Sequence, residues 1–331
     1  MRPRILVTGA SGKIGRHMVA ELLSRGYQVR ALTTKSAPAD VNQPAGLEWW
    51  QFDWSRSLSF GPLVAGCAGV LHLGAELHRL ERMQRSNIDA VRALVAASEA
   101  AGVKFFCYFS SVAVYGSPID ATVTEDSPLL THDRDVKSEY FAEDYLRYYG
   151  RTKLGGERVI YGEAKKVSYV ILRPTVVVDI PDLLEIGSWS SVKKAMTGYR
   201  HSHQIYVLDV VHATLWFMER HLESDSYDPA VGVYNLSNDD FVGNSYGQFF
   251  REAFRYSADS RFKTVQLPSI FDRTRDVMKF RLPPVRHSLG TIYFSPEKLY
   301  ATGYRHRYGM AEAHQRAFDV LAGRTGASSA R

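Results

Sequence analysis

The sequence predicts an α/β protein built on a doubly wound parallel sheet, followed by a smaller carboxyl-terminal lobe. In the first half of the chain, short apolar runs rich in β-branched residues alternate with amphipathic segments of helical spacing. This alternation is typical of parallel βαβ units with helices on both faces of a sheet. The first apolar run also leads directly into a glycine-rich loop that opens the first helical segment. The second half is less regular, as expected of a lobe placed over the carboxyl edge of the sheet.

The elements of the first half follow from this alternation. The first helix carries Ile14, Met18 and Leu22 at helical spacing and stops at Gly26, and the second ends at Gly102. Expected strands are 4–8, 27–32, 47–52, 70–73 and 104–110, and expected helices are 13–25 and 88–101.

The second half predicts fewer regular elements. Residues 139–165 have the length of one long helix, although Gly150, Gly155 and Gly156 lower its propensity. The other expected elements are strands at 167–172 and 232–236, a helix at 207–220, and late elements at 294–304 and 310–321. The small and polar tail, 322–331, is expected to be disordered.

Composition excludes several classes of protein. The 41 basic and 35 acidic residues give a net charge of +6, and 45% of the 331 residues are hydrophobic, as in ordinary globular proteins. The basic residues are scattered rather than gathered on one face, so no nucleic-acid partner is expected. No apolar stretch approaches the roughly 18 residues of a membrane span, so no membrane partner is expected either. Cys67 and Cys107 lack metal-ligand spacing and are expected to be reduced core residues of a cytoplasmic protein without a metal.

The glycine-rich loop indicates a phosphate-binding site. Gly9, Gly12 and Gly15 stand between the first strand and the first helix, where backbone amides and the helix amino end can bind a pyrophosphate. The first two glycines are separated by two residues, one more than in the commonest dinucleotide fingerprint. We therefore expect residues 1–174 to form a dinucleotide-binding domain, with segments around 205–236 returning to it. Residues 175–321 would mainly form the substrate lobe.

The loop and several later motifs together resemble the extended short-chain dehydrogenase/reductase family, of the NAD-dependent epimerase/dehydratase type. The matching segments are 72–75, 110–116, 149–153 and 172–174, with weaker echoes at 207–209 and 299–304. The resemblance implies a Rossmann-type fold and an NAD(P) cofactor. It assigns Asp53 to the adenine and Asn87 to the start of the following helix. The residues expected to bind the cofactor are Gly9, Gly12, Lys13, Ile14, Gly15, Arg16, Thr33, Lys35, Asp53, Leu73, Gly74, Ala75, Asn87, Tyr149, Lys153 and Pro174.

Three side chains indicate the kind of reaction that the site could catalyse. Tyr149 and Lys153 are four residues apart, so on a helix they share one face, and the ammonium can stabilise a tyrosine phenolate. Ser111, at the end of the fifth strand, can hydrogen-bond a substrate oxygen. Such a constellation permits proton transfer at an alcohol or carbonyl while a nicotinamide exchanges a hydride. Spacing disfavours Tyr148 as the base, and Ser111 matches the family's catalytic position better than Ser110.

The end of the second strand favours NADP(H), with NAD(H) as the alternative. NAD-selective sites place an acid there to bind the ribose hydroxyls, but this sequence has Thr33. Arg16 and Lys35 lie within sequence reach of a 2′-phosphate.

The expected function is that of an alcohol–carbonyl oxidoreductase, with a nucleotide-sugar epimerase or a non-catalytic NADP-binding regulator as alternatives. Val112 and Ala113 follow Ser111, where related dehydratases carry an Asp-Glu pair. Residues 203–206 lack the arginine that sugar-nucleotide enzymes often have there, although Arg286 could bind a diphosphate. Glu76 and Arg286 are weak candidates for substrate contact, and a homodimer is one expected assembly.

Overall fold

The computed structural model describes residues 2–35, 44–54, 56–116, 118, 120–130, 144–224, 231–280 and 290–324. Its centre is a seven-stranded sheet with the order β10-β7-β5-β4-β1-β2-β3, in which every neighbouring pair is parallel. The strand order reverses between β1 and β4, which is where doubly wound sheets bind ligands. The predicted fold class is thus confirmed. The strands are β1 (Arg4–Thr8), β2 (Gln28–Thr33), β3 (Leu47–Gln51), β4 (Gly69–His72), β5 (Phe105–Phe109), β7 (Ser168–Pro174) and β10 (Gly232–Leu236).

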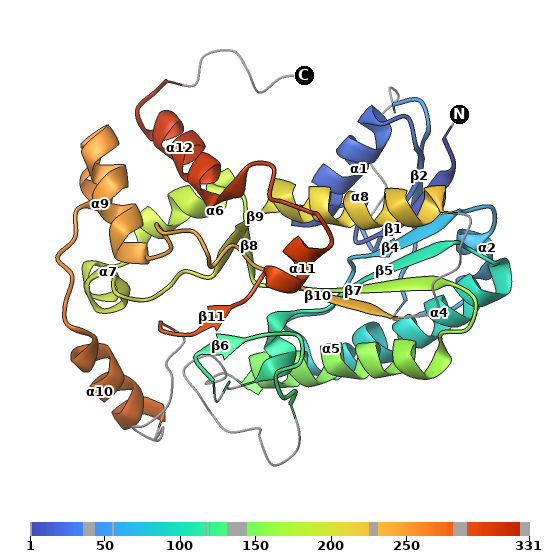
Figure 1. Ribbon diagram of the computed structural model, residues 1–331, viewed down its shortest axis with the longest axis horizontal. Helices are drawn as coiled ribbons and strands as arrows, with labels where there is room; N and C mark the ends of the chain where they lie inside the picture. Colours follow the sequence, from blue (N-terminus) through green and yellow to red (C-terminus); the bar gives the residue numbers. More distant parts are fainter. Residues whose placement is uncertain are drawn as a thin grey trace.

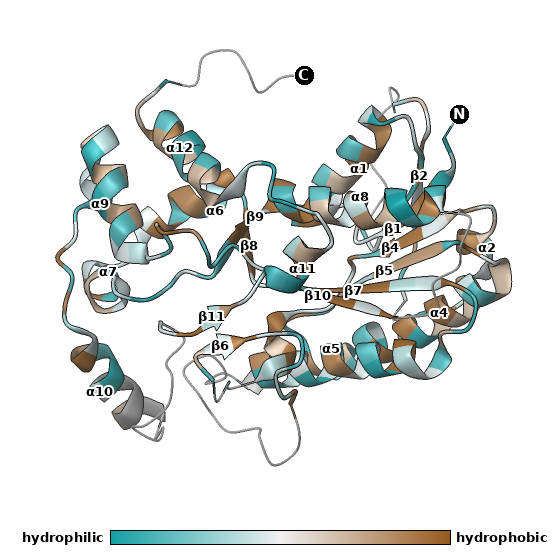
Figure 2. Cartoon of the chain, viewed as in Figure 1, coloured by the Kyte–Doolittle hydropathy of each residue, from teal (hydrophilic) through white to brown (hydrophobic). Residues whose placement is uncertain are grey.

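Helices cover both faces of the sheet (Figure 1). One face packs against α1 (Lys13–Ser24) and α8 (Val207–Glu223), and the other against α2 (Gly61–Val64), α4 (Ala90–Ala101) and α5 (Asp144–Glu163). Because strand side chains alternate between faces, Ile5 and Val7 enter one core and Leu6 the other. Figure 2 shows that the central strands are largely apolar, as burial on both faces requires.

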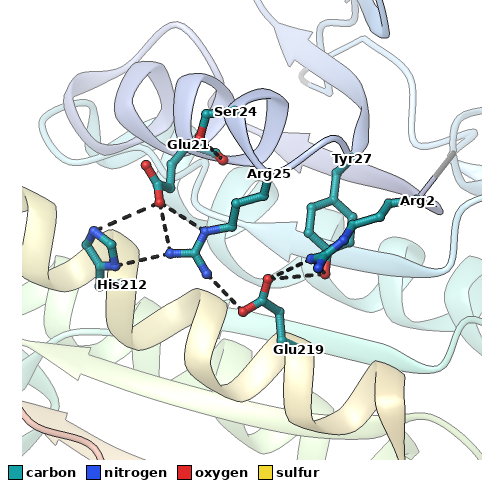
Figure 3. Close-up of polar contacts among 7 residues, drawn as sticks. All are labelled: Arg2, Glu21, Ser24, Arg25, Tyr27, His212 and Glu219. Carbon is teal, nitrogen blue, oxygen red and sulfur yellow. Dashed lines mark hydrogen bonds and ion pairs between the residues drawn. The ribbon is translucent and has the colours of Figure 1, made fainter.

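A polar cluster fastens α8 to the first helix of the chain (Figure 3). Arg25, the C-cap residue of α1, lies 2.8 Å from Glu21 of that helix and 2.8 Å from Glu219 of α8. Glu219 also accepts hydrogen bonds from the Arg2 guanidinium at 3.0 Å and from the Tyr27 hydroxyl at 3.3 Å. The chain that follows α8 then returns to the sheet, where β10 pairs with β7. These contacts place α8 and β10 against elements of the first 174 residues, and the division into a dinucleotide-binding domain and a substrate lobe stays a prediction.

The rest of the chain forms smaller elements beyond the carboxyl edge of the sheet. Two two-stranded pieces lie there, β8 with β9 and β6 with β11. Their strands are β6 (Thr122–Val123), β8 (Val176–Val178), β9 (Gln204–Tyr206) and β11 (Tyr293–Phe294). The helices are α3 (Leu80–Gln84), α6 (Ile180–Glu185), α7 (Ser191–Thr197), α9 (Tyr246–Ser257), α10 (Ser269–Phe280), α11 (Glu297–Ala301) and α12 (Gly309–Leu321). None of the described helices is long and apolar enough to cross a membrane.

Most expected elements are confirmed to within a few residues. The long helix is α5, and residues 139–143 of the expected range lie outside the described residues, as do 325–331 of the tail. The element expected at 294–304 is instead the end of β11 followed by α11. The helix expected from residue 88 begins as a π-helix over Arg85–Asp89, before α4. Cys67 and Cys107 are buried and unpaired, as expected.

Candidate functional site

A cavity of about 750 Å³ lies along the carboxyl ends of β1, β2 and β4. It includes eight of the residues selected from the sequence, namely Gly9, Gly12, Thr33, Asp53, Leu73, Gly74, Ala75 and Glu76. Its other lining residues, which sequence reasoning missed, are Ser11, Thr34, Trp54, His78, Arg79, Arg82 and Ser86. The lining does not include the selected residues Lys13, Ile14, Gly15, Arg16 and Lys35. The cavity lies at the switch point of the sheet, and its size and polar lining suit a dinucleotide.

The glycine loop has a backbone that side chains would obstruct. Gly9 has φ +65°, a conformation that favours glycine. A Cβ at Gly15 would lie 2.2 Å from the Gly9 carbonyl oxygen, so this glycine lets α1 approach the strand. Gly12 is the N-cap of α1 and provides no side-chain cap, so the helix amino end is left to another hydrogen-bond acceptor. These features fit the pyrophosphate of a dinucleotide.

The end of β2 carries hydroxyl groups where NAD-selective sites have an acid. Thr33 is buried, and its Oγ1 lies 2.9 Å from Ser11 Oγ and accepts the Lys35 amide at 3.1 Å. Thr34 follows in the lining, and Asp53 lines the cavity from beyond β3. Asp53 lies 3.5 Å from Arg56, which is largely exposed.

The two cations of the glycine loop contact a helix of the second half. Lys13 Nζ lies 2.7 Å from Asp182 Oδ2, and Arg16 Nη2 lies 2.6 Å from Asp179 Oδ2. His17 reaches the same Asp179 oxygen at 2.8 Å. Asp179 and Asp182 form the capping box of α6. Hydrogen bonds from His17 and Arg16, together with the Ile180 amide, hold the pKa of Asp179 below its ordinary value despite its burial. In this arrangement, the guanidinium that the sequence assigned to a cofactor phosphate is bound to a carboxylate.

Two arginines of the cavity wall have no such partner among the residues that the structure describes. Arg79 precedes α3 and Arg82 lies within it, and both are exposed. In the part of the chain that the structure describes, neither guanidinium makes a hydrogen bond or ion pair. Glu76 shapes this wall, because its Oε1 accepts the backbone amides of residues 77–79 at 3.1–3.2 Å. Both arginines are therefore available to an anionic ligand in the cavity.

The predicted catalytic residues lie on two neighbouring elements. Ser111 caps a 3₁₀ turn after β5, where its Oγ accepts the Ala113 amide at 3.1 Å. Tyr149 and Lys153 lie one turn apart on α5, which packs against that turn. A Cβ at Gly150 would lie 2.5 Å from the Ala113 carbonyl oxygen. The glycine that lowers the helix propensity of α5 thus allows its close approach to the serine segment.

Lys153 is buried, with 1% of its surface exposed. Its Nζ lies 4.2 Å from the centre of the Tyr108 ring, a cation–π contact. Burial lowers the pKa of Lys153 to about 7, and the Glu157 carboxylate opposes that shift. The Tyr108 ring stacks in turn on His72, with centroids 5.8 Å apart. The surroundings of Lys153 thus fix its position and make its proton easier to lose.

His72 is a buried link between the two sides of the site. Its Nδ1 lies 2.7 Å from Thr8 Oγ1, which accepts the Gly74 amide at 3.1 Å. No partner of His72 Nε2 occurs among the described residues. Burial, assisted by the Lys153 charge, lowers the pKa of His72 to about 3, so the imidazole is neutral at physiological pH. This geometry supports a structural role beside the cavity.

A buried ion pair lies one turn beyond Lys153. Glu157 binds Arg173 at the end of β7 through two hydrogen bonds, of 3.0 and 2.6 Å, and both side chains are at most 2% exposed. Glu157 also accepts a hydrogen bond from Ser110, the neighbour of the predicted catalytic residue Ser111. Arg173 donates to the Tyr115 hydroxyl at 2.9 Å. This network joins α5, β5 and β7 beneath the predicted catalytic groups.

Asn87 joins the cavity wall to α5. Its Nδ2 donates to the Glu76 carbonyl oxygen at 2.9 Å and to Thr152 Oγ1 at 3.0 Å, and its Oδ1 accepts the Glu76 amide at 2.9 Å. The residue is 1% exposed and lies within the π-helix. Its amide is committed to internal contacts and positions the segment before α3 against the turn that precedes Lys153.

The remaining predictions have mixed outcomes. Pro174 ends β7 and pairs with Leu236 of β10. Arg286, the weak substrate candidate, lies outside the described residues. The sequence analysis did not select Glu157 or Arg173 as residues of the site. Glu157 is four residues after Lys153, so helical spacing could have suggested it, whereas its pairing with Arg173 depends on the fold. Among the described residues, no group of three His, Cys, Asp or Glu side chains could hold a metal ion.

Comparison with known proteins gives matches that cover between 41% and 97% of this chain. A model described as the NAD dependent epimerase/dehydratase family matches residues 5–178. A Synechocystis protein provisionally named dihydroflavonol 4-reductase is 34% identical over 148 residues, which cover 41% of this chain and 42% of that protein. Dihydroflavonol 4-reductase of Hordeum vulgare is 24% identical over a match that covers 92% of this chain and 84% of that protein. A solved short-chain dehydrogenase/reductase superfamily protein from Agrobacterium tumefaciens, with bound NAD, has a TM-score of 0.71 at 22% identity, covering 97% of this chain and 98% of that one.

Proposed function

Because the chain belongs to the NAD-dependent epimerase/dehydratase family, we propose that it oxidises or reduces an alcohol–carbonyl pair with a nicotinamide dinucleotide. The family match confirms the resemblance drawn from the sequence, and with it the class of NAD(P)-dependent enzymes. The reductases among the relatives favour hydride exchange with an external substrate. One observation carries the proposal: Lys153 is buried one helical turn from Tyr149, on a helix packed against the Ser111 turn.

In the proposed reaction, the protein supplies proton transfer and positioning. Tyr149 gives its hydroxyl proton to the substrate oxygen in reduction and accepts it in oxidation. Lys153 stabilises the phenolate through its positive charge, and Ser111 donates a hydrogen bond to the same substrate oxygen. A dinucleotide in the cavity would supply or accept the hydride. Gly9, Gly12 and Gly74 would allow it to approach the backbone closely, and Asp53 would meet its adenine.

We also propose that the cofactor is NADP(H) rather than NAD(H). The absence of an acid at Thr33 and Thr34 supports this, since a carboxylate there would repel a 2′-phosphate. Arg79 and Arg82 line the same cavity as the threonines and could pair with the phosphate. They are better candidates than Arg16, which is bound to Asp179. Lys35 adds a further exposed cation.

The test is turnover of a panel of ketones and aldehydes with NADPH, by the wild-type protein and by Tyr149→Phe. The variant should lose about 10²–10⁴-fold in turnover while keeping its cofactor affinity, because only the proton donor is removed. Tyr148→Phe is the matched control and should keep most of the activity. Equal activity of Tyr149→Phe and the wild type would refute the assignment. Interconversion of sugar nucleotides without net cofactor consumption would indicate the epimerase alternative.

A further inference from the structure

Tyr108 of β5 contacts Lys153 both at its backbone and at its ammonium. The Tyr108 hydroxyl donates to the Lys153 carbonyl oxygen at 3.3 Å, and the centre of the ring lies 4.2 Å from Lys153 Nζ. Both residues are at most 1% exposed. Because water is largely excluded here, the attraction between the ammonium and the aromatic ring is stronger than it would be at the surface.

A glycine of α5 leaves room for the Tyr108 ring. A Cβ at Gly156 would lie 2.3 Å from the Tyr108 hydroxyl oxygen and 2.8 Å from the Asn87 carbonyl oxygen. Any side chain at this position would therefore displace the ring or move α5 away from β5. Gly156 lowers the helix propensity of α5, and in return the helix can pack directly on Tyr108.

The rings beside the ammonium are neutral at physiological pH. Burial, together with the Glu157 and Tyr149 charges, raises the pKa of Tyr108 well above its ordinary value of 10. Tyr108 thus keeps its proton and is excluded as the base at neutral pH. The His72 ring stacks on Tyr108 with centres 5.8 Å apart, and burial lowers the pKa of His72 to about 3. Neither ring therefore repels the Lys153 ammonium.

The aromatic contact attracts the ammonium without binding its hydrogen-bond donors. Among the residues that the structure describes, Lys153 Nζ makes this cation–π contact but no hydrogen bond or ion pair. The carboxylate of Glu157, one turn further along α5, is bound instead to Arg173 and Ser110. A carboxylate would accept the N–H groups directly, whereas an aromatic face attracts the charge as a whole. The N–H groups of Lys153 thus stay available for other acceptors.

We propose that Tyr108 is a positioning residue, whose ring holds the Lys153 ammonium in place for Tyr149 and leaves its N–H groups for the phenolate and the cofactor. The inference rests on the proposed function, since it assumes that Tyr149 transfers the proton and that Lys153 assists it. Without the attraction of the ring, the ammonium would move or lose its proton. The Tyr149 phenolate would then lose the positive charge that stabilises it, and turnover would fall.

Variants that separate the electronic character of the ring from its shape test this role. Tyr108→Phe keeps the aromatic face, and the Lys153 carbonyl keeps its helical hydrogen bond, so kcat should stay within about threefold of the wild type. Replacement of Tyr108 by trifluorophenylalanine preserves the shape but weakens the ring quadrupole. It should lower kcat by about tenfold relative to Tyr108→Phe.

A leucine pair controls for packing. Tyr108→Leu should lower kcat at least about tenfold, because it removes the ring altogether. Phe106→Leu is the matched control and should keep most of the activity. Phe106 is a fully buried ring of the same strand and lies 6.4 Å from His72, but it makes no cation–π contact within the described residues. Circular dichroism should show that all these variants are folded.

A second measurement does not depend on turnover. NMR of isotopically labelled lysine side chains follows the titration of the ammonium, and the Lys153 signal is assigned by its loss in Lys153→Met. In the trifluorophenylalanine variant the pKa of Lys153 should fall below its wild-type value of about 7, since the charged form loses the attraction of the ring. An unchanged pKa would overturn the inference.

The kinetic outcomes separate this inference from the proposed function. Equal turnover of Tyr108→Phe and the trifluorophenylalanine variant, with Tyr149→Phe inactive, would overturn the role of Tyr108 and leave the proposed function standing. An equal loss in Phe106→Leu and Tyr108→Leu would reduce that role to packing. Full activity of Tyr149→Phe would overturn the proposed function and this inference with it.

Discussion

The two sides of the carboxyl edge of the sheet are built differently. On the predicted cofactor side, around β1, β2 and β4, the cavity wall includes glycine backbone, hydroxyl groups and exposed arginines such as Arg82. On the predicted chemistry side, around β5 and β7, Lys153, Glu157 and Arg173 are at most 2% exposed, and Glu157 and Arg173 belong to one buried hydrogen-bonded network. The cofactor side thus keeps its hydrogen-bonding capacity for a ligand. The chemistry side uses that capacity internally, so its geometry is set before a ligand arrives.

The largest expected effect concerns the buried ion pair of the chemistry side. Arg173→Met should lower the free energy of unfolding by about 3–5 kcal/mol, because it leaves the Glu157 carboxylate buried without its counter-ion. Urea denaturation measures this. Arg16→Ala is the control, since it breaks a pair whose arginine side chain is 55% exposed and should cost about 1 kcal/mol or less. Similar losses in the two variants would show that the chemistry side is no better preorganised than the surface.

The second prediction concerns the glycine loop of the cofactor side. Gly12→Val should weaken NADPH binding by about a hundredfold while leaving the fold intact, because its Cβ would meet only the Gly9 carbonyl oxygen, at 3.1 Å, but would obstruct the pyrophosphate. Gly15→Val should instead destabilise the protein, since its Cβ would lie 2.2 Å from that oxygen. Titration calorimetry and circular dichroism separate the two effects. Normal NADPH binding by Gly12→Val would show that the glycine loop is only a structural turn and does not bind the pyrophosphate.

The third prediction is a pH dependence at His72, between the two sides. The folded-state pKa of about 3 lies below the ordinary value of 6.5, so between these values the unfolded chain binds the extra proton. The contribution of His72 is therefore complete above pH 6.5 and is lost as the pH falls toward 3. About 2 kcal/mol should disappear between pH 6.5 and 5. Urea denaturation at a series of pH values gives the free energy of unfolding of the wild type and of His72→Gln. Between pH 6.5 and 5 this free energy should fall more steeply for the wild type. An equal fall in the two proteins would contradict the prediction.

The smallest expected effect is cofactor selectivity. The wild type should bind NADPH about tenfold more tightly than NADH, which corresponds to one charge-assisted hydrogen bond. Arg82→Ala should remove most of this preference, Arg16→Ala should leave it, and Thr33→Asp should reverse it. Dissociation constants for both dinucleotides measure these changes. If Arg16→Ala removes the preference, the Asp179 ion pair must open when the cofactor binds.

Local patterns in the sequence determined the elements and part of the site. Strand and helix positions follow from hydrophobic periodicity, and Tyr149 and Lys153 share a helix face because they are four residues apart. The glycine loop could be recognised because its function depends on consecutive backbone conformations. Eight of the selected residues consequently meet at the cavity wall.

Only the tertiary structure decided which charges pair with one another. Arg16 lies 163 positions from the Asp179 that binds it, and the sequence therefore offered it as a phosphate ligand. Arg173 pairs with Glu157 because β7 lies beside β5 in the sheet and α5 packs over them. Arg79 and Arg82 reach the cavity because the segment after β4 folds beside Trp54. Electrostatic contacts act over a few ångströms regardless of sequence separation, so their partners are set by the fold, whereas helical and strand periodicity are set by neighbours along the chain.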